Sequence, residues 1–113
     1  MNRALCRLDE LPDGAARGFP APPGGFIGLF AVRQGETVHV YVNCCPHVGT
    51  ALDWAPDRFL APDGSAIVCS THGARFNIHD GVCTRGPCVG AALESVPVRI
   101  EDGVVLVPAN AGL

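Results

Sequence analysis

The sequence lacks several features that would place it in common functional classes. No long segment has the hydrophobic period of a helix, and no Gly-x-Gly-x-x-Gly turn for a dinucleotide is present. The longest apolar runs, such as Phe26 to Val32, are too short to cross a bilayer, so we expect no membrane partner. No apolar leader follows Met1, which predicts a cytoplasmic protein. The net charge of −3 argues against nucleic acid as a partner.

Composition and alternation favour an all-β fold. The 113 residues fit one domain over 1–113, and the 14 glycines and 10 prolines indicate many turns. Valines at 38, 40 and 42 alternate with His39, Tyr41 and Asn43, which predicts a half-buried strand over 36–43 with His39 on the surface. A strand over 26–33 precedes it, joined through a turn at Gln34-Gly35.

Further strands are short and separated by glycine and proline. A second hairpin runs from Val96, Val98 and Ile100 through Asp102-Gly103 to the segment 104–107. The remaining predictions are strands at 3–8 and 75–78, a small hairpin joining 58–60 to 66–68, and loops at 12–25 and 83–90.

Two clusters of metal-ligand residues stand out from this background. Cys45-Pro46-His47 and Cys69-Ser70-Thr71-His72 each offer one thiolate and one imidazole. Two cysteines and two histidines are the ligand set of a Rieske [2Fe–2S] centre. With their flanking residues, 45–52 and 69–77, both segments resemble the cluster-binding loops of Rieske ferredoxins. A structural zinc site, which accepts the same ligands, is the alternative.

The resemblance implies a fold and a role for each ligand. The fold is an antiparallel β sandwich with a small cluster-binding subdomain inserted at about residues 44–89. Cys45 and Cys69 would hold the inner iron, and His47 and His72 the outer iron near the surface. The segment 85–90 is similar to the proline loop that covers the cluster in Rieske proteins.

The implied function is electron transfer rather than catalysis. A soluble carrier of this family accepts one electron from a flavin- or NAD(P)H-linked reductase and passes it to a terminal oxygenase. A catalytic oxygenase needs a mononuclear iron held by two histidines and a carboxylate. Apart from the four proposed ligands only His39 and His79 remain, and 113 residues leave no room for a catalytic domain beside the cluster. The small subunit of nitrite reductase has a similar layout and is an alternative.

Departures from high-potential Rieske proteins predict a low reduction potential. Thr50 and Thr71 stand where those proteins have a disulfide, and Ala74 and Phe76 stand where they have hydroxyl donors. Fewer hydrogen bonds to the sulfurs stabilise the reduced state less, so we expect about −150 mV.

The remaining cysteines are not needed as ligands. Cys6 and Cys44 are interpreted as small buried hydrophobes. Cys83 and Cys88 could form a disulfide across the proline loop, although free thiols are favoured in a reducing compartment.

Overall fold

The computed structural model describes residues 2–21, 28–44, 46, 52, 58–69, 73–86 and 89–111. These ranges contain ten strands and a short 3₁₀ turn, η1 (Leu8–Glu10), but no α-helix. No helix within them is long and apolar enough to cross a membrane. The strands are β1 (Asn2–Arg7), β2 (Ala16–Phe19), β3 (Leu29–Gln34), β4 (Thr37–Val42), β5 (Ile67–Val68), β6 (Arg75–Phe76), β7 (Cys83–Arg85), β8 (Ser95–Val96), β9 (Arg99–Glu101) and β10 (Val104–Pro108).

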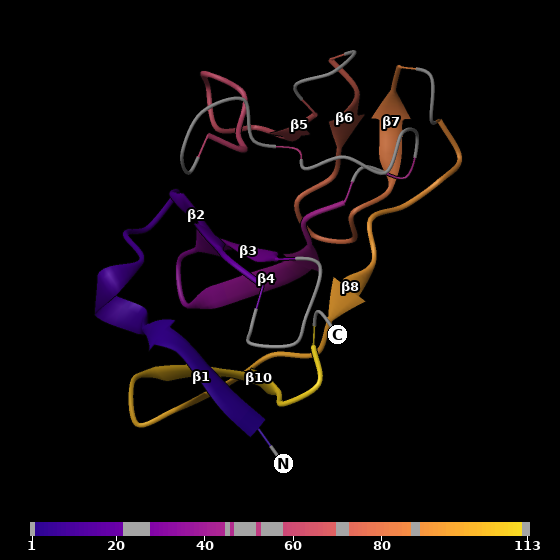
Figure 1. The fold of residues 1–113 in the computed structure, drawn as a ribbon. Coiled ribbons are helices and arrows are strands. Elements are labelled where there is room, and N and C mark those ends of the chain that lie inside the picture. The colour runs from indigo at the N-terminus through magenta and orange to yellow at the C-terminus, as the bar shows by residue number, and fades with distance from the viewer. Residues whose placement is uncertain are drawn as a thin grey trace.

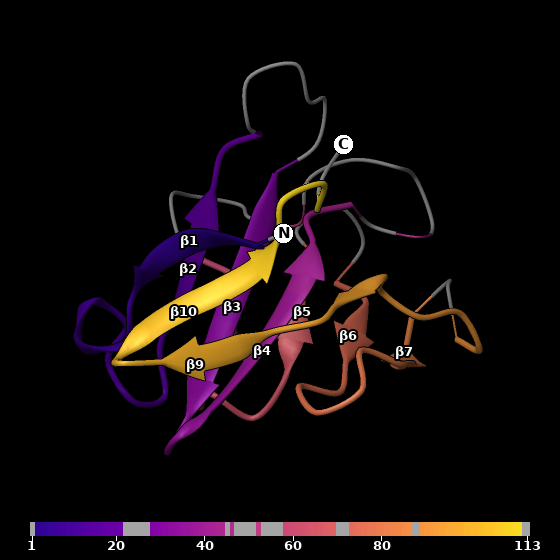
Figure 2. The ribbon, with the colours of Figure 1, turned by 90° about the horizontal axis from the view of Figure 1, so that it is seen from below.

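The strands form three antiparallel sheets (Figure 1). The outer sheet has the order β1-β10-β9, the central sheet β2-β3-β4-β8 and the small sheet β5-β6-β7. Figure 2 shows the outer sheet crossing the central sheet, with the small sheet to one side. In sequence the small sheet lies between β4 and β8 of the central sheet. The predicted all-β sandwich with an inserted subdomain is therefore confirmed.

The central sheet is buried on both faces. Leu29 and Ala31 of β3 pack in a core with valines of β4 and β10, between the central and outer sheets. Phe30 and Val32 pack in a second core with residues of the small sheet. A strand covered on both faces needs apolar residues at every position, which explains the apolar run here. β3 begins at Leu29, and the segment 22–27 lies outside the described residues, so the predicted start at residue 26 is not tested.

The prediction of a half-buried strand over 36–43 was wrong for one face. Val38, Val40 and Val42 do face the core beneath the outer sheet. On the opposite face Tyr41 is 2% exposed and His39 is half-buried rather than on the surface. The reason is tertiary, because the inserted segment covers this face and the strand pattern cannot reveal that cover.

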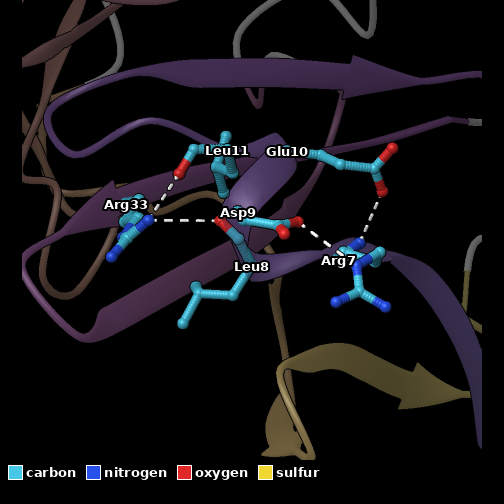
Figure 3. A network of polar contacts seen from close by, with 6 residues as sticks. All are labelled: Arg7, Leu8, Asp9, Glu10, Leu11 and Arg33. Carbon is cyan, nitrogen blue, oxygen red and sulfur yellow. Dashed lines mark hydrogen bonds and ion pairs between the residues drawn. The ribbon is translucent and has the colours of Figure 1, made fainter.

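Arg33 joins the 3₁₀ turn to the central sheet (Figure 3). Its guanidinium donates to the carbonyl oxygens of Leu8, at 3.1 Å, and Leu11, at 2.9 Å. At the start of the turn the Arg7 backbone amide donates to the Glu10 carboxylate at 2.7 Å. The predicted strand over 3–8 is confirmed through Arg7, and the turn that follows was not expected.

Two predicted loops contain strands. β2 lies within 12–25 and pairs with β3 from Ala16↔Val32 to Phe19↔Leu29. β7 lies within 83–90 and pairs with β6. Both predictions were wrong there, because glycine and proline in the flanking turns masked short strands that pair with the strand next to them in sequence.

Two further predicted hairpins, over 96–107 and 58–68, are present, the first with a change in its strand before the turn. The β9–β10 hairpin is confirmed, but the strand before it is split at Pro97: β8 pairs with β4, whereas β9 pairs with β10. Proline has no backbone N–H group to donate to a neighbouring strand, and the chain passes from the central to the outer sheet there. The small hairpin is confirmed as a bridge between Leu60 and Ile67.

Candidate metal centre

The structure places one of the four predicted ligands. Cys69 follows β5 directly and is 1% exposed, within the core shared by the central and small sheets. Cys45, His47 and His72 lie outside the described residues. Cys69 thus stands at the end of β5, at the first position of the second predicted cluster loop.

The base of the second predicted cluster loop is closed by two backbone hydrogen bonds. The Cys69 amide donates to the Ala74 carbonyl at 2.9 Å, and the Gly73 amide donates to the Cys69 carbonyl at 3.1 Å. Gly73 has a φ of 67°, a conformation that favours glycine. These bonds extend the pairing of β5 with β6 by one row. They hold the two ends of the segment 70–72 side by side.

The first predicted cluster loop is tied to the end of β4. The Asn43 side-chain oxygen accepts a hydrogen bond from the Leu52 amide at 2.8 Å. Leu52 itself is fully buried in the core beneath the small sheet. The backbone amide of Asn43 in turn donates to the Gly28 carbonyl at 2.9 Å, which anchors this position to the central sheet. The sequence analysis assigned Asn43 no role at the site. Its position two residues after Tyr41, in step with the alternation of the strand, could have indicated that its side chain faces the inserted segment.

The third predicted loop contacts the second through Gly86. A Cβ at Gly86 would lie 2.9 Å from the Ala74 Cα and 3.2 Å from the Ala74 Cβ, and the φ of Gly86 is 98°. Only glycine allows this approach. The second and third predicted loops therefore contact each other at this residue, while Pro87 and Cys88 lie outside the described residues.

Tyr41 links the central sheet to the turn before β7. Its hydroxyl donates to the Ile78 carbonyl at 2.5 Å. Gly81 completes this contact, because a Cβ there would lie 2.7 Å from the Tyr41 ring. Burial, with a smaller contribution from the charge of Asp80, raises the pKa of Tyr41 to about 12. This joint holds the inserted segment against the central sheet.

The other described cysteines fit packing roles. Cys6 is buried on β1, where burial raises the pKa of its thiol. Cys44 is half-buried against the same core. The Cys83 thiol is buried and donates to the Arg85 carbonyl at 3.3 Å. The predicted choice between a disulfide and free thiols involves Cys88, outside the described residues, and stays untested.

Comparison with known proteins identifies the family. The sequence profile of the Rieske [2Fe–2S] domain matches residues 3–100. The ferredoxin component of the p-cumate 2,3-dioxygenase system of Pseudomonas putida is 31% identical over 107 residues, which are 95% of this chain and 85% of that protein. The match to the family profile spans the two predicted cluster loops and the whole central sheet, and it ends before β10.

Solved structures agree with this assignment. The ferredoxin of carbazole 1,9a-dioxygenase from Nocardioides aromaticivorans IC177 has a TM-score of 0.76 and 26% identity, covering 96% of this chain and 97% of its own. The Sphingomonas yanoikuyae B1 ferredoxin has a TM-score of 0.72 and 26% identity, covering 96% and 98%. The chain belongs to the Rieske [2Fe–2S] domain family, and it is a one-electron carrier of the ferredoxin type, with a [2Fe–2S] cluster as its cofactor, rather than an enzyme.

Proposed function

We propose that this chain receives electrons from a flavin- or NAD(P)H-linked reductase and delivers them to the terminal oxygenase of a dioxygenase system. Its likeness to a ferredoxin component over 95% of its own length carries this proposal. The chain also covers 97% of the carbazole 1,9a-dioxygenase ferredoxin at 26% identity, which supports the role of a carrier.

We propose that Cys45 and Cys69 bind one iron and that His47 and His72 bind the other. When bound, the cluster accepts and releases a single electron, and with two neutral imidazoles it is easier to reduce than a four-thiolate cluster. The burial of Cys69 supports its place on the inner iron. The spacing of the other three residues in their loops supports their assignment.

Other residues of the chain would position the loops and exclude water. Ala74 and Phe76 are buried beside Cys69 and present no hydroxyl. Asn43 holds the end of the first loop through the Leu52 amide. Apolar side chains next to the cluster would reduce the access of water to it, and this influences its reduction potential.

The domain boundaries and the location are also proposals. We propose a single domain over 1–113 with a cluster-binding subdomain at about 44–89, supported by the insertion of the small sheet between β4 and β8. We propose a cytoplasmic location, since reductants linked to NAD(P)H are found there.

Spectroscopy of protein purified without oxygen tests the proposal. We expect a red-brown protein that, after dithionite, gives a rhombic EPR signal with an average g below the free-electron value. Cys45→Ala and Cys69→Ala should lose iron and sulfide, whereas the neighbouring control Cys44→Ala should retain both. A colourless protein with stoichiometric zinc, even after reconstitution with iron and sulfide, would contradict the proposed function.

Reconstitution of turnover tests the partners. The wild-type protein should couple NAD(P)H oxidation by the reductase to substrate oxidation by the oxygenase, and His72→Ala should not. The matched control is His79→Ala, which removes an exposed histidine of the turn before β7. A coloured protein that supports no substrate oxidation in the presence of both the reductase and the oxygenase would contradict the assignment to a dioxygenase system.

A further inference from the structure

The last row of the small sheet adjoins the second and third predicted cluster loops. In this row Val68 of β5 pairs with Arg75 of β6, and Arg75 pairs with Arg85 of β7. Cys69 follows Val68, and Gly86, which contacts the second loop, follows Arg85. Two arginines that are ten positions apart in sequence thus meet at the end of the sheet where the loops begin.

The row faces away from the core. The neighbouring row of Ile67, Phe76 and Cys83 is buried beneath the sheet. Alternation along β5 and β6 puts Val68 and Arg75 on the opposite face. In β7, Cys83 and Arg85 are two positions apart, and an irregularity in the pairing, with Thr84 as the extra residue, brings Arg85 opposite Arg75. Arg75 is half-buried there and Arg85 is exposed.

The positive charge of this row is only partly compensated. Arg75 donates to the Ser65 hydroxyl at 3.3 Å. Hydrogen bonds from Ser65, with a smaller effect of the Arg75 charge, lower the pKa of the Asp63 carboxyl. For Arg85, no carboxylate in the described part of the chain lies within ion-pair distance. Like charges directly opposite each other across two strands destabilise a sheet.

An exposed apolar side chain lies just beyond the arginines. Val89 is 64% exposed, the highest value for a large hydrophobic residue among those described. Its amide donates to the Gly86 carbonyl at 3.4 Å, which places it in the turn directly after β7. Arginine is among the residue types that are enriched at protein–protein interfaces.

We propose that Arg75 and Arg85 form a docking site for carboxylates on the contact face of a redox partner protein. The inference rests on the proposed function, because the row matters for electron transfer only if the adjacent loops hold the cluster. Arginine binds carboxylates with paired, charge-assisted hydrogen bonds, and an acidic partner would relieve the repulsion between the two guanidiniums. The net charge of −3 would repel an acidic partner, so the local positive charge of the two arginines is needed to orient that partner.

Electron transfer to small charged reagents tests the local field. The holoprotein, reduced with dithionite, passes one electron to ferricyanide, an anion, or to tris(phenanthroline)cobalt(III), a cation, in a stopped-flow instrument. Removing both arginines, as Arg75→Gln with Arg85→Gln, should slow the reaction with ferricyanide by about tenfold at low salt and leave the cationic reaction as fast or faster. The difference should vanish at high salt.

The control changes the net charge equally but elsewhere. Arg7→Gln with Arg99→Gln removes two exposed arginines from the outer sheet and should leave the ratio of the two rates near that of the wild type. Arg85→Gln alone should give part of the effect, and as an exposed substitution it should not disturb folding. Equal rates in the wild type and the Arg75/Arg85 variant would overturn the proposal.

Binding of labelled poly-L-glutamate to the holoprotein tests the occupant. Fluorescence anisotropy should rise with wild-type protein and the Arg7/Arg99 control but not with the Arg75/Arg85 variant. Displacement by inorganic phosphate at the same charge concentration would indicate a simple anion site, and tighter binding of a single-stranded DNA oligomer would indicate nucleic acid; both would overturn the proposal. The visible spectrum is recorded first, so a colourless protein refutes the proposed function, whereas a coloured protein with unchanged rates refutes only the docking site.

Discussion

Raising the pH above 10 should destabilise this protein through Tyr41, its single tyrosine. The ring is 2% exposed, and the hydroxyl donates to the Ile78 carbonyl at 2.5 Å. Burial first, and the nearby charge of Asp80 second, raise the pKa of Tyr41 from 10 to about 12. Folding therefore favours the protonated phenol.

The size and sign of the effect follow from linkage. A shift of two pKa units corresponds to about 2.7 kcal/mol. The unfolded chain releases the proton near pH 10, whereas the folded protein retains it to about pH 12. The contribution is thus fully present below pH 10 and is lost between pH 10 and 12. Tyr41→Phe should remove this pH dependence and cost about 1–3 kcal/mol at neutral pH, because the Ile78 carbonyl loses its buried donor.

Two measurements on the holoprotein check the prediction. Labelling with [¹³Cζ]tyrosine gives one resonance, whose chemical shift reports the ionisation of Tyr41 directly. Urea unfolding at several pH values between 8 and 11.5 should show a steeper loss of stability above pH 10 in the wild type than in Tyr41→Phe. The phenylalanine variant is the matched control, since it retains the ring and its packing.

Two results would refute the reasoning. One is a midpoint near pH 10 for the tyrosine resonance while the visible spectrum shows an intact cluster. The other is an equal alkaline loss of stability in the wild type and in Tyr41→Phe. Either would mean that the hydroxyl is not held in the buried joint between the central sheet and the turn before β7.

The other predictions concern the loops and the potential. Gly86→Ala should destabilise by about 1–3 kcal/mol in thermal unfolding, because its Cβ would lie 2.9 Å from the Ala74 Cα. Gly90→Ala, with a similar φ of 95° and open space, should cost less, and equal losses would contradict the close approach. Asn43→Ala should leave the amide of Leu52 without its acceptor and speed cluster release to a chelator, followed by visible absorbance. An unchanged release rate would exclude this role. The reduction potential should lie near −150 mV in a redox titration, and a value well above zero would contradict the prediction.

The ligand set could be predicted without a structure because its signals are local in sequence. Cys45 and His47 are separated by one residue and Cys69 and His72 by two, so the ligand types and spacings can be read without a fold. Gly86 was part of the predicted third loop, and its contact with the second loop is present in the structure. The β9–β10 hairpin was equally clear, because alternation and an Asp-Gly turn act over a few residues.

The elements that were missed depend on contacts that lie outside their own segment. β2 is a strand because β3 pairs with it, and no alternation within 12–25 announced that pairing. The burial of Tyr41 is similar, since its cover comes from a segment almost forty positions later and contacts it through the Ile78 carbonyl. Pairing and cover are properties of the assembled sheets rather than of any window of sequence.

The sequence by itself determined the family and a β-rich chain, and it predicted the ligand set of the cluster. Spacing along the chain is enough for these, because ligand chemistry and turn preference act over a few residues. Only the tertiary structure decided which faces are buried and which charges meet. It covers both faces of β3, hides the Tyr41 hydroxyl and brings Arg75 opposite Arg85 beside the loops. Strand register sets these contacts, and it results from packing of the whole chain.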